Sequence, residues 1–302
     1  WENELRNNIW TYPIEKVWNG IQTSYANMAA SVNEQYGIQL TKIGSIGISA
    51  MMHGYMPFDN SGNLLVPFRT WRNNITGEAA EKLTKLFDFN IPERWSIAHL
   101  YQAILNHEDH VKQIDFITTL DGYVSWKLSG NKNTGIGDAS GMFPIDEATK
   151  TYDTKMLKQF ADLPEVAQYP WDIKDILPEV LMAGHSAGKL TAEGAKLLDK
   201  SGQLQPGSLI APSEGDAGTG MVATNAVRKR TGNISAGTSA FSMVVLDQKL
   251  NKVHRDIDMV TTPDGAPVAM VHTNNCSSDI NAWANVFNQF AKVLGVNLSP
   301  NQ

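Results

Sequence analysis

The chain has 302 residues, of which 42% are hydrophobic and 19% charged, so it can bury a sizeable core and lacks the composition of a disordered protein. Its net charge of −6 and isoelectric point near 5.6 argue against a nucleic-acid partner, which would favour a basic surface. Cys276 is the only cysteine, which excludes an internal disulfide, and no apolar run approaches the ~20 residues of a membrane helix. We therefore expect a cytoplasmic protein without a membrane partner. The sequence does not decide whether the protein forms a homodimer.

The first seventy residues predict a helix, a strand and a hairpin. Apolar residues recur every three or four positions from Ile14 to Val32, which indicates an amphipathic helix that Gly37 would end. Residues 43–51 are small or β-branched and predict a buried parallel strand. A hairpin is expected from Tyr55 to Phe68, around a turn at residues 60–63.

The middle of the chain is predicted to be mainly helical, over residues 76–128 and again over 150–200. A short strand is expected near residues 114–118, and the glycine-rich stretch 130–144 predicts a loop. This pattern separates two strand-rich blocks, so we place a domain boundary near Ser208.

The second strand-rich block begins with a strand at residues 207–211. A glycine-containing loop at residues 215–220 is expected to open a helix that runs to Arg230. The remaining expected elements are a hairpin of 233–236 with 240–246, a strand at 268–271, and a helix at 279–294 with Asp279 near its N-cap. The hairpins argue against a simple doubly wound sheet of parallel strands.

The segment from Ser213 to Gly220 places an acid among glycines, between an expected strand and an expected helix. Such glycines let the backbone approach a ligand, and the helix N-terminus offers free N–H groups. The Asp216 carboxylate could accept the proton of a hydroxyl nucleophile, because orientation matters more than basicity in phosphoryl transfer. The alternative is an Asp that caps the helix in a tight turn.

Three other segments carry candidate binding residues. The turn Gly237-Thr238-Ser239 offers N–H groups and hydroxyls to a phosphate, or is an ordinary hairpin turn. Met52-His53-Gly54 ends the expected strand, where ligands of α/β proteins gather, although His53 could be a core histidine. Trp71 and Arg72 suit the apolar face and hydroxyl rim of a sugar, or form a surface Trp capped by Arg.

Other kinds of site find little support. The seven histidines show no metal-binding spacing, and the chain contains no Walker-type loop and no dinucleotide-binding glycine motif after a strand. Glu214 and Asp216 leave a hydrolase with paired carboxylates as an alternative, but acids two residues apart in a turn need not flank one bond.

Six segments follow one another in an order typical of one known family. They are Gly47–Gly54 with its Met-His-Gly, Thr70–Asn73, Asp121–Gly130, Gly137–Met142, Glu214–Asp216 and Ser235–Ser239. In this order they resemble the FGGY carbohydrate kinases, nearest the xylulokinase and pentulokinase branch.

The resemblance implies an α/β, actin-like ATPase (ribonuclease H-like) fold, with two domains, a cleft between them and an incomplete second domain. Residues 1–207 would be the sugar-binding N-terminal FGGY domain without its first hairpin, and residues 208–302 the start of the ATP-binding C-terminal FGGY domain. The family's opening hairpin and later adenine-binding segment have no counterpart here, so we expect the middle part of a longer kinase.

The resemblance also implies ATP-dependent phosphorylation of a sugar hydroxyl, in a ketose such as xylulose or a related polyol, with ATP and Mg²⁺. Asp216 would be the general base, and Gly237, Thr238 and Ser239 would approach the ATP phosphates; no metal ligand is assigned. The implied substrate-binding residues are Met52, His53, Gly54, Trp71, Arg72 and Asp138.

Two departures from the family's pattern leave the sugar open. Ala217 stands where relatives usually have Asn or Gln, which removes an amide able to bind a sugar hydroxyl. His99 replaces a lysine expected after Trp95. The alternative function is a catalytically silent sugar-binding or regulatory protein on the same fold.

Overall fold

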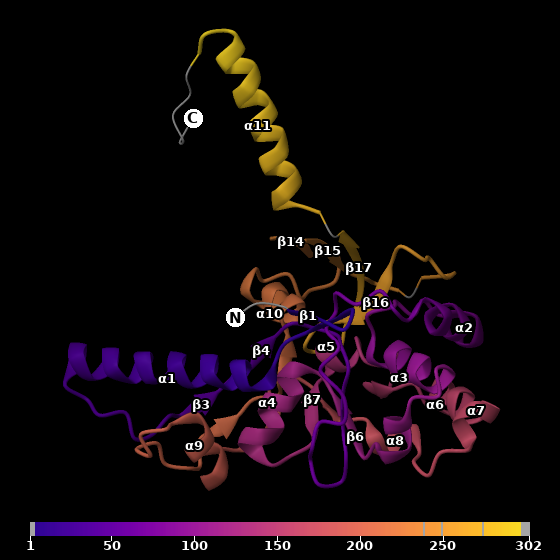
Figure 1. Ribbon diagram of the computed structural model, residues 1–302, viewed down its shortest axis with the longest axis horizontal. Coiled ribbons are helices and arrows are strands. Elements are labelled where there is room, and N and C mark those ends of the chain that lie inside the picture. Colours follow the sequence, from indigo (N-terminus) through magenta and orange to yellow (C-terminus); the bar gives the residue numbers. More distant parts are fainter. Residues whose placement is uncertain (1–3, 238, 249, 274, 297–302) are drawn as a thin grey trace.

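The computed structural model describes residues 4–237, 239–248, 250–273 and 275–296. Figure 1 shows a body of helices and short strands, with a larger sheet and a projecting helix at the C-terminal side. The helices are α1 (Ile14–Tyr36), α2 (Gly77–Phe87), α3 (Ser96–Leu105), η1 (Asp109–Gln113), α4 (Leu120–Ser129), α5 (Ile136–Ala139), α6 (Thr154–Ala161), α7 (Pro164–Ala167), α8 (Ile173–Ile176), α9 (Ala192–Leu198), α10 (Asp216–Ala223) and α11 (Ser277–Val293). The strands are β1 (Glu4–Arg6), β2 (Ile9–Thr11), β3 (Ser45–Ile46), β4 (Ser49–Ala50), β5 (Met56–Phe58), β6 (Phe116–Thr118), β7 (Asn133–Gly135), β8 (Ile145–Asp146), β9 (Thr151–Tyr152), β10 (Glu179–Leu181), β11 (Gly188–Lys189), β12 (Leu209–Ile210), β13 (Glu214–Gly215), β14 (Gly232–Ala236), β15 (Ala240–Val245), β16 (Asp258–Thr261) and β17 (Pro267–Thr273).

Two pairs of short parallel strands join distant parts of the chain. β3 pairs with β12, and β4 pairs with β13. The segment 43–51 is therefore parallel, as predicted, but the prediction of one continuous buried strand is wrong. The segment that pairs with residues 43–51 contains Pro212, between β12 and β13. Proline has no N–H to donate to the ladder, so the pairing is interrupted there.

This pairing places the residues that follow β4 beside those that follow β13, at the carboxyl ends of two neighbouring strands. It also bears on the domain boundary, because a division near Ser208 would separate β12 and β13 from the strands to which they are hydrogen-bonded. We propose that the first domain continues through α10 and that residues 224–231 connect it to the second.

The helix predicted from Ile14 onward is confirmed as α1. Gly37 ends it in the left-handed conformation at φ 66°, and its N–H donates to the Asn33 carbonyl at 2.8 Å. Only Val17, Trp18 and Tyr25 of α1 are buried, and Figure 1 shows the rest of the helix extending from the body. The β1–β2 hairpin before it was not predicted.

The loop predicted at residues 130–144 is wrong for residues 133–139, which form β7 and α5, whereas the residues on either side have no regular structure. Its glycines serve close packing instead of a loop. A Cβ at Gly135 or at Gly137 would come within 2.3 Å of a Glu214 carboxylate oxygen. The hairpin predicted from residue 55 is confirmed by bridges between Tyr55 and Arg69 and between Phe58 and Leu64.

The C-terminal sheet has the strand order β14-β15-β17-β16, all antiparallel, and contains the predicted hairpin as β14 and β15. The predicted extension of the preceding helix to Arg230 is wrong: α10 ends at Ala223, because Asn225 adopts a left-handed conformation at φ 55°.

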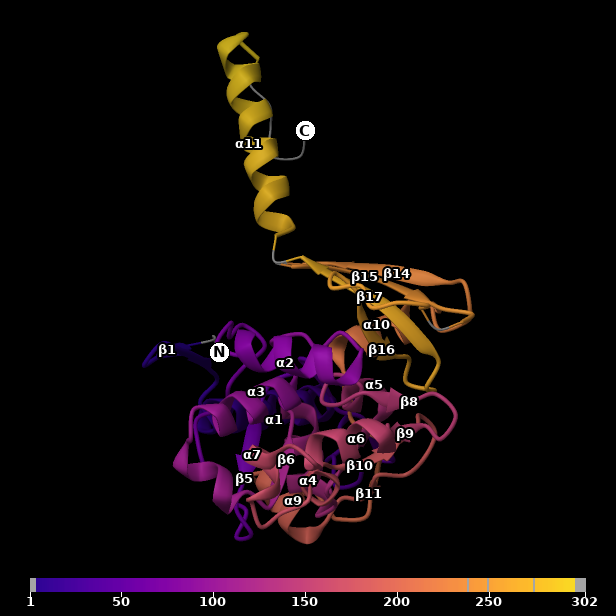
Figure 2. The ribbon, with the colours of Figure 1, turned by 90° about the vertical axis from the view of Figure 1, so that its right-hand side faces the viewer.

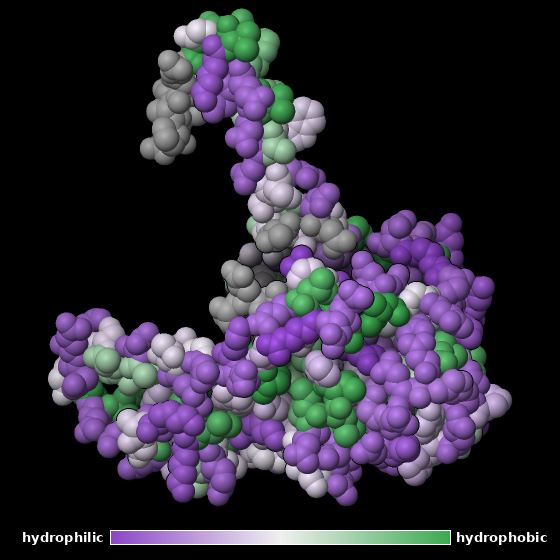
Figure 3. All heavy atoms as spheres, viewed as in Figure 1, coloured by the Kyte–Doolittle hydropathy of each residue, from purple (hydrophilic) through white to green (hydrophobic). Residues whose placement is uncertain are grey.

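The last helix, α11, projects from the sheet away from the body in Figures 1 and 2. The helix predicted at residues 279–294 is confirmed, although it begins at Ser277 after the N-cap residue Cys276. Asp279, predicted near the N-cap, lies in the first turn. None of its residues is buried, and Figure 3 shows hydrophobic residues along its surface. Within the described ranges, no helix is both long and apolar enough to cross a membrane.

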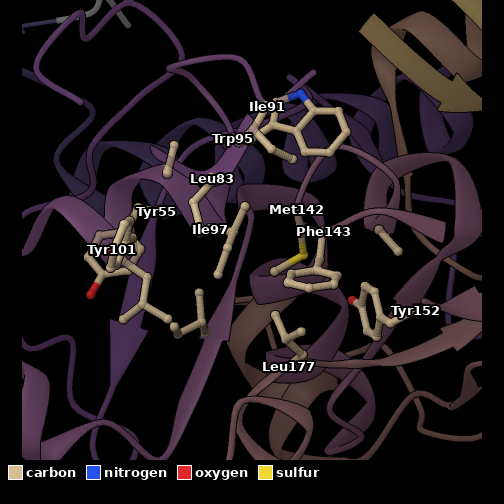
Figure 4. Close-up of a cluster of buried hydrophobic side chains, with 14 of the residues drawn as sticks. Tyr55, Leu83, Ile91, Trp95, Ile97, Tyr101, Met142, Phe143, Tyr152 and Leu177 are labelled. Carbon is tan, nitrogen blue, oxygen red and sulfur yellow. The ribbon is translucent and has the colours of Figure 1, made fainter. Parts of the chain in front are cut away.

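The core lies in two clusters of buried apolar side chains. Figure 4 shows part of the larger cluster, in which Tyr55, Trp95 and Phe143 lie near Leu83 of α2 and Ile97 of α3. This packing holds the loop that follows Met52 against the helix that begins after Trp95, so it fixes one wall of the site described next.

Candidate functional site

A cavity of about 610 Å³ lies between the end of β4, the start of α10 and the C-terminal sheet. Many of the predicted site residues line it together: Met52, His53, Trp71, Arg72, Asp216, Gly237 and Ser239. Gly54 and Asp138 are not among its lining residues, and Thr238 lies outside the described residues.

Asp216 is the first residue of α10 and is exposed to the cavity. Its Oδ1 accepts the N–H of Ala217 at 3.0 Å and that of Met52 at 3.4 Å. No other group in the described part of the chain bonds this carboxylate, so Oδ2 is available to a ligand. Desolvation by the surrounding protein raises the pKa of Asp216, while the two N–H donors oppose that shift.

His53 has a backbone conformation that is uncommon for a residue with a side chain, at φ 73°. Its ring is buried, and Nε2 has no hydrogen-bond partner among the described residues. Burial, helped by the charge of Arg94, lowers the pKa of His53 well below its ordinary value, so the imidazole is neutral. A buried nitrogen without a partner at a cavity wall is suited to a ligand hydroxyl.

Gly54 explains how the chain can turn at this point. Its φ is 106°, and a Cβ would lie 2.7 Å from the Phe68 ring and 2.8 Å from the Arg69 carbonyl oxygen. The residue therefore shapes the wall from behind and does not face the cavity.

Arg72 lies against two indole rings at the cavity. Its guanidinium carbon is 4.4 Å from the centroid of Trp10 and 5.8 Å from that of Trp71. Buried Asn73 holds Trp10 in place: its Oδ1 accepts the Trp10 N–H and its Nδ2 donates to the Trp10 carbonyl, each at 2.8 Å. The N-terminal hairpin is thus fastened to the Trp71 loop.

The C-terminal sheet contributes the other wall. Gly237 donates its N–H to the Ser239 carbonyl at 2.9 Å, so that N–H is not free for a phosphate oxygen. His272 stacks on Phe241 with ring centroids 4.5 Å apart, and Trp71 meets it edge-on at 6.2 Å. Side chains of the two parts of the chain are therefore in contact across the cavity.

Arg94 also lines the cavity and links both parts of the chain. Its Nη2 forms an ion pair with Asp258 of β16, which also accepts a hydrogen bond from the Asn90 amide. The Nε of Arg94 is buried without a hydrogen-bond partner among the described residues.

Three buried carboxyl groups lie behind the cavity: Asp121, Asp138 and Glu214. Glu214 accepts the N–H groups of Gly137 and Asp138 at 3.3 and 3.1 Å, and burial raises its pKa to about 8. Burial and neighbouring Asp121 raise the pKa of Asp138 well above its ordinary value.

The geometry does not favour the alternative of paired hydrolytic carboxylates. Glu214 is directed into the buried cluster, whereas Asp216 lines the cavity. Because the two acids occupy different environments, they cannot flank one scissile bond.

Nothing in the described part of the chain forms a group of three or more His, Cys, Asp or Glu side chains that could hold a metal ion. Asp216 is the one carboxylate among the lining residues that the structure describes. A magnesium ion bound here would thus take most of its ligands from water and phosphate oxygens, as Mg²⁺ commonly does.

The N-terminal domain of the FGGY family of carbohydrate kinases matches residues 12–202, more than half of the chain. The chain belongs to the FGGY family. The C-terminal domain of FGGY kinases matches residues 232–296. The family resemblance predicted from the ordered segments is confirmed.

Individual relatives are distant. The xylulose kinase of Staphylococcus xylosus is 23% identical over 155 residues, which cover 48% of this FGGY chain and 30% of that protein. The chain spans between 30% and 44% of the length of the curated relatives it matches.

Solved structures of sugar and glycerol kinases superimpose on nearly the whole of this chain. A xylulose kinase from Rhodospirillum rubrum superimposes with a TM-score of 0.75 at 17% identity, over 94% of this chain and 56% of that one. A glycerol kinase from Plasmodium falciparum gives 0.70 at 16% identity, over 95% and 57%. The predicted α/β, actin-like ATPase fold of FGGY kinases is confirmed.

The sequence did not point to several cavity residues: Trp10, Tyr12, Asn74, Arg94, Met270 and His272. Each belongs to a segment without a recognisable motif, and only folding brings it to Asp216. Asn74 is the exception, because it directly follows the Thr70–Asn73 segment that the sequence did single out.

Proposed function

We propose that this FGGY protein transfers the γ-phosphoryl group of ATP to a hydroxyl of a sugar or polyol, with Asp216 as the general base. One observation carries the proposal. Oδ1 of Asp216 is held by two backbone N–H groups, and its other oxygen is available in a cavity that Gly237 and Ser239 also line.

The chemistry follows from that arrangement. The substrate hydroxyl gives its proton to Asp216 Oδ2 as its oxygen bonds to the γ-phosphorus, and the bond to ADP breaks with its electron pair on ADP. Because the transition state of phosphoryl transfer is loose, the orientation of the hydroxyl is the main contribution of the carboxylate. The raised pKa of Asp216 makes it a better proton acceptor than an ordinary aspartate.

The sugar would lie against the first domain. The indole of Trp71 offers an apolar face, and the unpartnered Nε2 of His53 suits a hydroxyl. Gly54 supports this wall from behind, and Asp138 would act from the buried cluster without touching the sugar. Ala217 offers no amide, so the choice of sugar depends on other residues.

The ATP phosphates would approach the turn at Gly237 and Ser239. Apart from its two chain neighbours, no described residue has a heavy atom nearer than 3.9 Å to a Cβ placed at Gly237, which leaves space beside the backbone. Mg²⁺ bound to ATP would bridge phosphate oxygens and neutralise the developing charge. We also propose a cytoplasmic location, since ATP would be the donor, while the homodimer stays a prediction.

Replacing Asp216 tests the assignment of the base. We expect Asp216→Asn, made in the full-length product of the gene, to lower kcat for ADP formation at least about a hundredfold, because the amide cannot accept the proton. Asp109→Asn is the matched control, as this carboxylate is exposed on η1, away from the cavity.

The outcomes separate the alternatives. Wild-type activity in Asp216→Asn means that another group is the base. A wild-type protein that binds sugars in calorimetry but forms no ADP with any of them is the silent sugar-binding protein.

A further inference from the structure

Two arginines, Arg72 and Arg94, line the cavity that holds Asp216. The histidines beside them carry no charge near neutral pH: burial lowers the pKa of His272 to about 4, and that of His53 also falls. The cations of the described cavity wall are therefore these two guanidinium groups. A substrate that offers only hydroxyl groups does not require either of them.

Arg72 is held in place without an acidic partner. It stacks on Trp10 and Trp71, and Asn73 fastens the backbone of Trp10 in both directions. In the part of the chain that the structure describes, no carboxylate lies within ion-pairing distance of Arg72. A guanidinium fixed by aromatic faces loses little side-chain entropy when it binds an anion.

Arg94, the second arginine of the cavity, has a side chain whose hydrogen bonds are only partly made. Its Nη2 is committed to Asp258, but its buried Nε lacks a partner among the described residues. A buried charged donor left without an acceptor is costly unless a ligand supplies one. The nearby Nε2 of His272 is likewise buried and unpartnered within the described residues.

We propose that the phosphorylated substrate is a sugar acid, whose carboxylate is held by Arg72 and Arg94 while one of its hydroxyls lies at Asp216. This inference rests on the proposed function and names the substrate class of the same site. The planar fork of a guanidinium matches a carboxylate with two parallel hydrogen bonds, which makes the contact selective as well as attractive. The cavity of about 610 Å³ lies within the usual range for small-molecule sites.

Matched substrate pairs test the proposal. D-Gluconate and D-glucitol, like D-arabinonate and D-arabinitol, differ only in having a carboxylate or a hydroxymethyl group at C1. We expect the full-length gene product with ATP and Mg²⁺ to show a kcat/KM for the acid at least about tenfold above that for its polyol.

Variants of Arg72 test whether its guanidinium group causes the preference for the acid over the polyol. Arg72→Gln is expected to abolish the preference for the acid, and Arg72→Lys to keep part of it, because lysine retains the charge but not the fork. Lys229→Gln, at an exposed position outside the cavity, is the control that should leave the preference unchanged. A thermal melt of each variant verifies that it is folded.

Two results would overturn the proposal. One is equal or better turnover of polyols or neutral ketoses by the wild-type protein. The other is an Arg72→Gln variant whose KM for ATP rises equally with every sugar, which would assign the arginine to the ATP phosphates. If no sugar is phosphorylated at all, the proposed function fails, and calorimetric binding of D-gluconate against D-glucitol still decides the preference for an anion.

Discussion

The site depends on a few residues whose backbones are held in demanding positions. His53 and Gly54 both have positive φ, and Gly54 has backbone and ring atoms where any larger residue would place its Cβ. The N–H of Met52, just before them, is one of the two donors to Asp216. The uncommon backbone conformation of His53 therefore lies directly beside the donor that holds the proposed base.

Substituting Gly54 tests this local constraint. We expect Gly54→Ala to lower the free energy of unfolding by about 1–3 kcal/mol or more, because the added Cβ meets Phe68 and the backbone of Arg69. Gly44→Ala is the control: a Cβ there meets nothing within 4 Å, so its effect should stay within about 0.5 kcal/mol. Urea denaturation measures both, and equal stabilities of the two variants would contradict the account.

At the residue scale, the sequence predicted those site residues that sit in motifs and missed those that do not. Asp216, His53 and Trp71 each lie in a short segment of characteristic composition. Arg94 and His272 are isolated in sequence, and their role follows only from contacts with Asp258 and Trp71. Such long-range contacts leave no local pattern.

At the scale of elements, the strand β13 and the helix α5 are joined by a buried acid. Glu214 bonds the backbone of Gly137 and Asp138, and the glycines of this stretch make room for its carboxylate. The glycine-rich stretch predicted a loop because flexibility is the commoner use of glycine. The strand at 43–51 was predicted as continuous because Pro212, which interrupts its ladder, lies far away in sequence.

The buried acid predicts a pH dependence of stability. The pKa of Glu214 rises from an ordinary 4.5 to about 8 on folding, so between these values the folded protein holds a proton that the unfolded chain has released. Its contribution to stability is therefore full below pH 4.5 and is lost as the pH rises toward 8, with a slope of up to about 1.4 kcal/mol per pH unit. Burial also raises the pKa values of Asp121 and Asp138, so these acids add to the same loss of stability with rising pH.

Removing the titrating group should flatten this dependence. Glu214→Gln is expected to be less stable overall, because its amide N–H₂ would face a backbone donor, but its stability should fall less steeply from pH 5 to 8. Glu34→Gln, at an exposed position of α1, serves as the control. Denaturation curves at several pH values give the slopes, and identical slopes for wild type and Glu214→Gln would show that the acid does not titrate in this range.

At the scale of the molecule, the cavity is built by two parts of one chain. Arg94 pairs with Asp258, and Trp71 meets His272, so each part supplies groups that contact the other beside the proposed base. The ordered motifs were enough to predict the FGGY family and its fold. The sequence also predicted a helix at residues 279–294, but it gave no sign that α11 would project from the sheet with Trp283, Phe287 and Phe290 exposed.

Phosphorus NMR of the reaction mixture tests the central claim most directly, because it follows the γ-phosphate of ATP to its product. With the full-length gene product, Mg²⁺, ATP and the best sugar of the panel, we predict a sugar phosphomonoester signal that grows together with ADP. The same mixture with Asp216→Asn should form that signal at least about a hundredfold more slowly. A phosphomonoester formed at the wild-type rate by this variant, or inorganic phosphate as the only product of the wild-type protein, would contradict the account.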